Sequence, residues 1–484
     1  MPTHLLRRSL AAAGALGVAI LGAVATGPAA HATPPGVIYH DPSPQQVMAY
    51  VHQNAPKPYL GWSSWSMQSS NYPGLNPRGA YSYLTAAHVL QQGAAMAATL
   101  KRHGYSYINI DAGWWRKWDW TPEYDRYGRP PVDAARFPDG IEPVIQTLHK
   151  EGLKVGIYLP VGIEKGAVDN GDFPIYGAPG CSTHDVVYAD LRTTNAWDSS
   201  YKLDFSNPCA QYYLDSIAHE FADWGIDFFK MDGVGPGSER DNDGSNYDNS
   251  SDVRAWATAL AGSGRAIHFE LSWALNHDDV ATWQRWSNGW RISIDVECYC
   301  NTLVQWAPST TKNSIVQRFR EAPAWTSDAG PGGWNDLDSL DVGNGQMDGI
   351  TDAERQTYMT LWAIEAAPLF IGDDITGLDP YGKRLLTNDE VIAIDQAGVP
   401  ARPISTATPQ QVWSATLPDG STVVALFNLG DTAAGVTANL ADLGIGGNVW
   451  ARNVWQHVGR HVRSGQLREQ LPAHGSALFR VRTS

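Results

Sequence analysis

The chain has 484 residues and a formal charge of −15, and loss of a leader that contains Arg7 and Arg8 takes this charge to about −17. So acidic a protein is poorly suited to bind nucleic acid or an anionic membrane, and it suits a neutral substrate. Its length exceeds what one hydrophobic core usually supports, so we expect one large and one small domain.

Residues 1–32 have the pattern of a signal peptide that is removed from a secreted protein. Arg7-Arg8 precede an apolar run from Leu10 to Val24, and Ala30-His31-Ala32 forms an A-x-A cleavage site. The apolar run is short and rich in Gly and Ala for a membrane span, and no other stretch of the sequence approaches one. The paired arginines also permit twin-arginine export, so both export routes stay open.

After a lead-in over residues 33–58, apolar segments alternate with helical segments from residue 59 to 398. We expect helices over 84–103, 141–150, 209–224, 253–260, 279–287, 315–321 and 353–366, and strands near residues 60, 108, 156, 230, 268, 292, 333 and 370. Strands alternating with helices imply right-handed parallel units. Eight such strands favour a closed (β/α)8 TIM barrel over an open sheet.

The pattern changes over residues 401–484. Short segments at 411–415, 422–427 and 477–481 alternate in polarity or are β-branched, and turns such as Asp419-Gly420 separate them. This pattern predicts a small antiparallel β domain, a β-sandwich, after the barrel.

Four cysteines in an exported chain suggest two disulfides. Four cysteines allow three connectivities, of which we expect Cys181–Cys209 together with Cys298–Cys300. The sequence has no spaced cluster of His, Cys and carboxylates that is typical of a metal site. We therefore expect neither a metal nor another cofactor.

The stretch Phe228–Gly233 is typical of a buried parallel strand, and it carries one cation and one carboxylate. Because side chains alternate along a strand, Lys230 and Asp232 share a face. Burying both is costly unless they pair with each other or meet a ligand. Asp232 is therefore a candidate catalytic carboxylate at the open end of a barrel strand, and a structural ion pair under a loop is the alternative.

A second such stretch runs from Trp290 to Asp295 and is expected to place Arg291 and Asp295 on one face of another strand. Two carboxylates across a barrel mouth suit glycoside cleavage, in which one attacks the anomeric carbon and the other protonates the leaving oxygen. We expect Lys230 to keep Asp232 ionised. A structural Arg–Asp pair is the alternative for the second stretch.

Other polar and aromatic residues also fall at the expected strand ends. Each alone could cap the following helix. Nine residues converging on one rim instead favour a binding site, and they are Trp65, Asp111, Tyr158, Lys230 with Asp232, Ser272, Asp295, and Asp336 with Asp338. The run Trp114–Trp120 could line an outer sugar subsite or pack on the barrel rim.

From about Tyr59 to its C-terminus, the chain resembles glycoside hydrolase family 27, the α-galactosidase or melibiase family. The matching motifs, in family order, are Gly61–Trp65, Gly104–Asp111, Trp224–Asp232, Trp290–Asp295, Gly333–Asp338 and Trp362–Leu369. Several long motifs in order are more specific than any single one. The resemblance implies a barrel with a C-terminal β-sandwich and a retaining hydrolase of oligo- or polysaccharides, most simply an α-galactosidase.

The resemblance also implies individual roles. Asp232 would be the nucleophile and Asp295 the general acid/base, with net retention of anomeric configuration. The implied substrate-binding residues are Trp65 under the sugar ring, Asp111 and Lys230 on its hydroxyls, Tyr158 beside the pocket, Ser272 on its floor, Arg291 near the 2-hydroxyl and Asp338 on the wall.

Two departures from the family pattern bear on the substrate. Galactosidases of the family usually have two successive acids that hold the 4- and 6-hydroxyls, where this chain has Asp111-Ala112. Losing one acceptor removes about 1–3 kcal/mol of hydrogen bonding. In addition, Ser272 stands where galactosidases often have Glu. An α-1,6-glucan (an isomaltodextranase-like activity) or a β-L-arabinopyranoside therefore stays open as the substrate, and a non-catalytic carbohydrate-binding protein is the less favoured interpretation.

Overall fold

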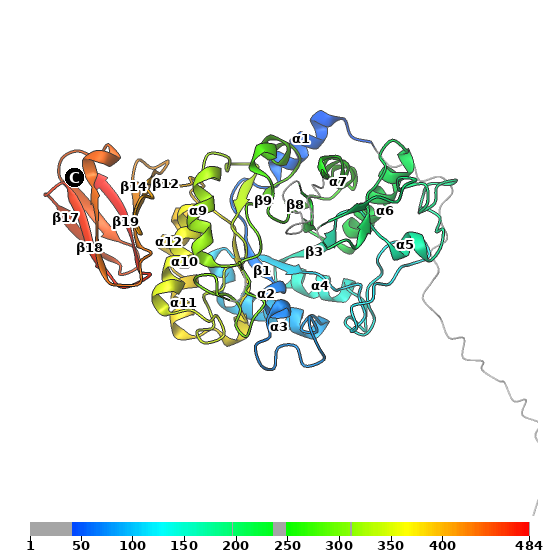
Figure 1. Ribbon diagram of the computed structural model, residues 1–484, viewed down its shortest axis with the longest axis horizontal. Helices are drawn as coiled ribbons and strands as arrows, with labels where there is room; N and C mark the ends of the chain where they lie inside the picture. Colours follow the sequence, from blue (N-terminus) through cyan, green and yellow to red (C-terminus); the bar gives the residue numbers. More distant parts are fainter. Residues whose placement is uncertain (1–40, 196, 236–247, 310–311, 484) are drawn as a thin grey trace, which may run out of the picture. The chain divides into compact units, whose positions relative to one another are not determined.

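The computed structural model describes residues 41–195, 197–235, 248–309 and 312–483 (Figure 1). The expected signal peptide, residues 1–32, lies outside them. Within the described part of the chain, no helix combines the length and the apolar character needed to cross a membrane.

Eight parallel strands form one curled sheet in the order β10-β9-β8-β7-β3-β2-β1-β11. Their bounds are β1 (Leu60–Ser63), β2 (Tyr107–Ile110), β3 (Lys154–Pro160), β7 (Phe228–Asp232), β8 (His268–Leu271), β9 (Gly289–Arg291), β10 (Trp334–Asp336) and β11 (Leu369–Ile371). Beyond β10, Leu340 forms a parallel bridge with Ile371, which brings the two edges of the sheet together. The expected eight-stranded barrel is therefore confirmed.

Helices alternate with these strands, and the capping residues explain where several begin and end. The helices are α1 (Pro44–Gln53), α2 (Trp65–Ser69), α3 (Ala86–Thr99), α4 (Glu142–Lys150), α5 (Gly166–Asp169), α6 (Pro208–Trp224), α7 (Ser250–Gly262), α8 (Val280–Trp286), α9 (Ile315–Trp325), α10 (Asp352–Ile364), α11 (Pro380–Leu386) and α12 (Asp389–Asp395). The side chains of Thr85, Asn207 and Thr351 accept backbone hydrogen bonds at the starts of α3, α6 and α10. Gly225 ends α6 in the left-handed conformation.

A small antiparallel sheet is inserted between β3 and α6, in the order β4 (Ile163–Glu164), β6 (Ser200–Tyr201), β5 (Thr193–Thr194). It was not expected from the sequence. The insertion lies against the end of β7, because a Cβ atom at Gly233 would come within 2.6 Å of Asn195 and 2.8 Å of Trp197. Gly233 has a φ of 70°, so glycine suits this position for its conformation as well as its size.

The C-terminal part is antiparallel, and its strands are coloured orange to red in Figure 1. A six-stranded sheet has the order β12-β13-β14-β19-β16-β17, and β15 pairs with β18. The bounds are β12 (Arg402–Ser405), β13 (Gln410–Thr416), β14 (Thr422–Asn428), β15 (Ala434–Asn439), β16 (Val449–Asn453), β17 (Val458–Val462), β18 (Gln466–Leu471) and β19 (Ser476–Thr483). Apolar side chains of both sheets form one core, as expected for a β-sandwich.

Aromatic rings fill the barrel at the N-terminal ends of its strands. Tyr59, Tyr107, Phe228 and Phe370 form one buried cluster, and His268 stacks on Phe228 with their ring centroids 5.0 Å apart. On β7, Lys230 and Asp232 follow Phe228 on the same face, further toward the C-terminal end. The aromatic cluster is therefore an apolar floor beneath the polar residues of the barrel.

Candidate active site

Asp232 is the last residue of β7, and its carboxylate is buried and hydrogen-bonded. The hydroxyl of Tyr158 donates to Oδ2 at 2.8 Å, and the backbone N–H of Gly233 donates to Oδ1 at 2.9 Å. Burial raises the pKa of Asp232, whereas the charge of Lys230 lowers it and the charge of Asp295 raises it. Asp232 and Asp295 therefore lie close enough to interact electrostatically.

Lys230 pairs with a different carboxylate from the one that the sequence suggested. Its Nζ atom lies 3.0 Å from Oδ2 of Asp111, at the end of β2, and both side chains are buried. Burial lowers the pKa of Lys230 and the charge of Asp111 raises it, with a net rise. Lys230 thus acts on Asp232 through its charge and not through a direct contact, because side chains two residues apart on a strand lie about 7 Å from each other.

Asp111 is held by donors from two neighbouring strands. Ser63 Oγ and Asn109 Nδ2 donate to its Oδ2 atom at 3.1 and 2.9 Å, and the backbone N–H of Ala112 donates to Oδ1 at 2.8 Å. With Lys230 added, four donors fix this carboxylate. It is therefore a rigid hydrogen-bond acceptor at the end of β2.

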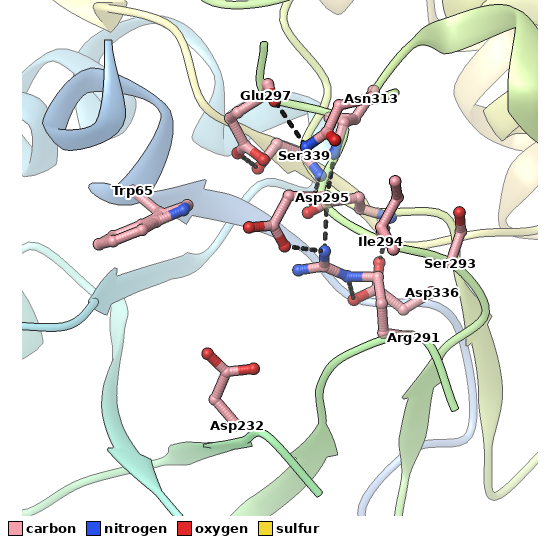
Figure 2. Close-up of polar contacts among 12 residues, drawn as sticks. Trp65, Asp232, Arg291, Ser293, Ile294, Asp295, Glu297, Asn313, Asp336 and Ser339 are labelled. Carbon is pink, nitrogen blue, oxygen red and sulfur yellow. Dashed lines mark hydrogen bonds and ion pairs between the residues drawn. The ribbon is translucent and has the colours of Figure 1, made fainter. Parts of the chain in front are cut away.

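Asp295 lies in the loop after β9, which corrects the expectation that residues 290–295 form one strand. The strand ends at Arg291, where its pairing with β10 also ends: the N–H of Ile292 makes the last bond of that ladder, to the carbonyl of Asp336. Arg291 and Asp295 nevertheless meet, with Nη1 donating to Oδ1 at 3.1 Å. Figure 2 shows Asp295 and Arg291 on the side toward which the Asp232 carboxylate points, with Trp65 beside them.

Arg291 is a buried cation within a cluster of carboxylates. Its guanidinium contacts Asp336 at 3.2 Å and Asp338 at 2.5 Å, in addition to Asp295. Carboxylate oxygens of Asp295, Glu297 and Asp338 lie within 4.8 Å of one another, close enough to hold a metal ion. Because Arg291 already contacts two of these three side chains, a fixed guanidinium supplies positive charge there.

Aromatic residues also lie close to Asp295. Trp65 stacks on Tyr81 with the ring centroids 5.4 Å apart, and Tyr81 contacts Trp120 at 4.7 Å. The Nε1–H group of Trp65 donates to the hydroxyl of Tyr299 at 3.3 Å. This hydroxyl in turn donates to Oδ2 of Asp295.

The aromatic run 114–120 divides into two parts. Trp114 and Trp115 are fully buried, and Trp115 stacks on Tyr158 at a centroid distance of 6.1 Å. Packing on the barrel, one of the two alternatives, thus accounts for this pair. Trp120 instead lies partly exposed beside Tyr81, so the alternative of an outer sugar subsite stays open for it.

Ser272 follows β8, and its backbone hydrogen-bonds to both sides of Asp232. Its N–H donates to Met231 at 2.9 Å, and its carbonyl accepts from Val234 at 3.0 Å. The hydroxyl of Ser272 lowers the pKa of Asp232, against the effect of burial. All nine site residues expected from the sequence thus lie in the C-terminal half of a barrel strand or in the segment that follows one.

Two neighbours of Asp295 were not among the expected site residues. Tyr299 lies four positions after Asp295, between Cys298 and Cys300. This short spacing from the expected acid/base residue could have pointed to it. Tyr81 lies in the loop between α2 and α3, where no periodicity points to it. Two carboxylates, two nearby cations and flat aromatic side chains together can cleave a glycosidic bond.

Known proteins share both parts of this architecture. The family model described as alpha galactosidase A matches residues 57–206 and 186–397. The model of the alpha galactosidase C-terminal beta sandwich domain matches residues 407–481. An α-galactosidase of Cyamopsis tetragonoloba is 28% identical over 448 residues, which cover 90% of this chain and 88% of the relative.

Two crystal structures are similar along most of the chain. A GH27 β-L-arabinopyranosidase of Geobacillus stearothermophilus is 26% identical with a TM-score of 0.78, covering 90% of this chain and 98% of its own. The α-galactosidase I of Mortierella vinacea is 26% identical with a TM-score of 0.66, covering 89% and 98%. Since the family models match most of its length, this chain belongs to the α-galactosidase family, glycoside hydrolase family 27, and is a glycosyl hydrolase.

Proposed function

We propose that this enzyme removes terminal α-D-galactosyl residues from oligo- or polysaccharides by double displacement, with retention of anomeric configuration. The observation that supports it most is the pairing of two carboxylates at one mouth of the barrel. Asp232 ends β7 and Asp295 follows β9, and their charges interact. In retaining glycosidases the corresponding carboxyl groups are about 5–5.5 Å apart.

In the first step, an oxygen of Asp232 attacks the anomeric carbon while the bond from that carbon to the leaving oxygen breaks. Asp295 gives its proton to the leaving oxygen and becomes a carboxylate. In the second step, Asp295 takes a proton from water, whose oxygen attacks the same carbon and displaces Asp232. The two inversions give net retention.

Asp232 must be ionised to attack, although it is buried. The hydroxyl of Tyr158 at 2.8 Å and the N–H of Gly233 at 2.9 Å stabilise the charged form. Lys230 adds a positive charge close by. These groups oppose the effect of burial on its pKa.

The other site residues would hold the sugar. We assign Trp65 to the face of the ring, because an indole covers the C–H groups of a pyranose. The carboxylates and cations around the sugar would bind its hydroxyls. They are Asp111 and Lys230, at β2 and β7, and Arg291 and Asp338, at β9 and β10. Tyr158 and Ser272 lie beside the nucleophile.

A β-L-arabinopyranoside is the second candidate substrate. Ala112 stands where family galactosidases usually have a second acid, and one of the similar structures is a β-L-arabinopyranosidase. L-Arabinopyranose has the same ring arrangement without the 6-hydroxymethyl group, so it has less need for that acid. A panel of nitrophenyl α-galactoside, β-L-arabinopyranoside and α-glucoside, with dextran, separates the candidates. Activity on dextran or the arabinoside alone would contradict the galactosidase proposal.

The mechanism is tested by Asp232→Ala in the full chain. We expect the loss of several orders of magnitude in kcat with an unchanged unfolding midpoint, because no nucleophile remains. Azide should restore turnover and yield a glycosyl azide of inverted configuration. The matched control is Asp139→Ala, at an exposed position, which should keep wild-type turnover. Near-normal hydrolysis by Asp232→Ala would refute the mechanism.

We further propose that the enzyme is secreted after removal of residues 1–32. The A-x-A site at residues 30–32 supports this proposal, as do the two disulfides, Cys181–Cys209 and Cys298–Cys300. N-terminal sequencing of protein recovered from the medium of the producing cells should begin at Thr33. Recovery of all active enzyme inside the cells would contradict it.

A further inference from the structure

A disulfide encloses a single residue next to Asp295. Cys298 and Cys300 are bonded across a sequence separation of 2, so Tyr299 is the one residue between them. Its backbone has a φ of 51°, in the left-handed region that a non-glycine residue rarely adopts. The backbone here is therefore held by its surroundings in a conformation that brings this tyrosine toward the site.

Neighbouring segments anchor this loop. The backbone N–H of Asn71, after α2, donates to the carbonyl of Cys300 at 2.8 Å. Its side-chain amide donates to the carbonyl of Tyr299 at 3.4 Å. On the other side, the N–H of Cys298 donates to Leu303 at 3.1 Å. The loop is thus tied to the segment that carries Trp65 and to the residues that directly follow the disulfide.

The side chain of Tyr299 joins two residues that have proposed roles. Its hydroxyl accepts from Trp65 and donates to Oδ2 of Asp295, whose Oδ1 atom accepts from Arg291. Burial raises the pKa of Tyr299 well above its usual range, and the charge of Asp295 adds to this effect. The hydroxyl therefore keeps its proton and remains a donor.

We propose that Tyr299 is a positioning residue for the acid/base carboxylate and that the Cys298–Cys300 disulfide holds it in place. This inference rests on the role proposed above for Asp295. A donor bound to a carboxylate stabilises its charged form. Tyr299 thus makes Asp295 release its proton to the leaving oxygen more readily and fixes the direction of the carboxyl group.

The other charged groups around Asp295 do not replace this hydroxyl. Arg291 also favours the ionised carboxylate but contacts the other oxygen. Asp232, Glu297 and Asp338 are carboxyl groups near enough for the charge of Asp295 to raise the pKa of each, and it raises the pKa of the Tyr81 hydroxyl as well. Removing Tyr299 from this set leaves Oδ2 without its phenolic donor.

The test is Tyr299→Phe, which removes one oxygen and keeps the ring. We expect the alkaline limb of the kcat/KM pH profile to move up by about one unit, the effect of a hydrogen bond to a charged group. The loss of kcat should be about tenfold for a substrate with a poor leaving group and small for a nitrophenyl glycoside, which needs little protonation. Tyr201→Phe is the control, because the Tyr201 hydroxyl donates to Asp169 on the exposed insertion.

The disulfide is tested by Cys298→Ser with Cys300→Ser, alone and combined with Tyr299→Phe. We expect the cysteine pair to move the alkaline limb in the same direction and to add nothing to Tyr299→Phe, because both changes act through one hydrogen bond. Fully additive shifts would overturn the role of the disulfide. An unmoved limb in Tyr299→Phe, with equal losses on all leaving groups, would overturn the role of Tyr299.

Asp295→Ala separates this inference from the proposed function. Its loss of kcat should depend steeply on the leaving group, as expected when the general acid is removed. If it does and Tyr299→Phe has no such dependence, the inference is wrong and the proposed role of Asp295 stands. If Asp295→Ala lacks the dependence, both are wrong.

Discussion

The hydroxyl of Tyr158, on β3, donates to Oδ2 of Asp232, on the neighbouring strand β7, at 2.8 Å. Both side chains are buried. Burial raises the pKa of Tyr158 well above its usual range, so this group stays a donor across the working pH range of an enzyme. The carboxylate of Asp232 therefore has a permanent donor that favours its charged form, against burial, which favours its neutral form.

Tyr158→Phe should raise the pKa of Asp232 further and so move the acidic limb of the kcat/KM profile to higher pH. One hydrogen bond to a charged group corresponds to about one pH unit. The alkaline limb should stay where it is, since Asp295 does not contact Tyr158. Hydrolysis of one nitrophenyl glycoside, followed from low to high pH, measures both limbs. An acidic limb that stays in place would show that Asp232 does not set it.

The position of Asp232 could be predicted from sequence because the pattern that indicates it lies within a few neighbouring residues. A short apolar run with one carboxylate at its end predicts a buried strand, and β7 ends at that carboxylate. The partner of Lys230 could not be predicted in this way. Asp111 lies 119 residues earlier and meets Lys230 because β2 and β7 flank the same strand, β3, on opposite sides.

The loop after β9 is a second feature that the local sequence pattern could not predict. The apolar pattern of residues 290–295 suits a strand, but β9 ends at Arg291 and the chain turns where its N–H groups meet residues at and just after the end of β10. The N–H of Ile292 donates to Asp336, and the N–H of Val296 donates to the Asp338 side chain. These long-range bonds place Asp295, and no local pattern encodes them.

Ala112→Asp should change which sugar the enzyme prefers. Ala112 follows Asp111, and family galactosidases usually have a second acid at this position. A new carboxylate that bonds the 6-hydroxyl should favour the α-galactoside over the β-L-arabinopyranoside by about 5- to 150-fold, or about 1–3 kcal/mol. The ratio of the two kcat/KM values measures this change, and Ala112→Asn is the control for size. An unchanged ratio in a folded variant would place residue 112 outside the specificity pocket.

Removing the Cys181–Cys209 disulfide should destabilise the protein by about 2–4 kcal/mol. This bond closes a loop with a sequence separation of 28, between the barrel insertion and the start of α6. Cys181→Ser with Cys209→Ser is compared with Cys298→Ser with Cys300→Ser, whose loop separation is 2. Because the entropy of loop closure grows with loop length, the second pair should cost less. Equal shifts of the urea midpoint would contradict this account.

Asp215, on α6, makes the stability of the folded protein depend on pH. This carboxylate is buried, and Gln211 Nε2 donates to its Oδ1 atom at 2.9 Å. Burial raises its pKa to about 6, against a smaller lowering by Gln211, and the charge of Asp41 adds to the rise. Because the folded pKa lies above the unfolded value of about 4, the folded state holds the proton more tightly. Stability is therefore full below pH 4 and falls as the pH rises to about 6.

Asp215→Asn should remove this fall, because the amide keeps the oxygen that Gln211 binds and does not ionise. The variant should match the wild type near pH 4 and exceed it by up to about 3 kcal/mol at pH 7, since two pKa units correspond to that free energy. Urea unfolding at several pH values measures the difference. Asp139→Asn, at an exposed position, is the matched control and should shift neither curve. A gain that is the same at pH 4 and pH 7 would mean that packing, and not the ionisation of Asp215, separates the two proteins.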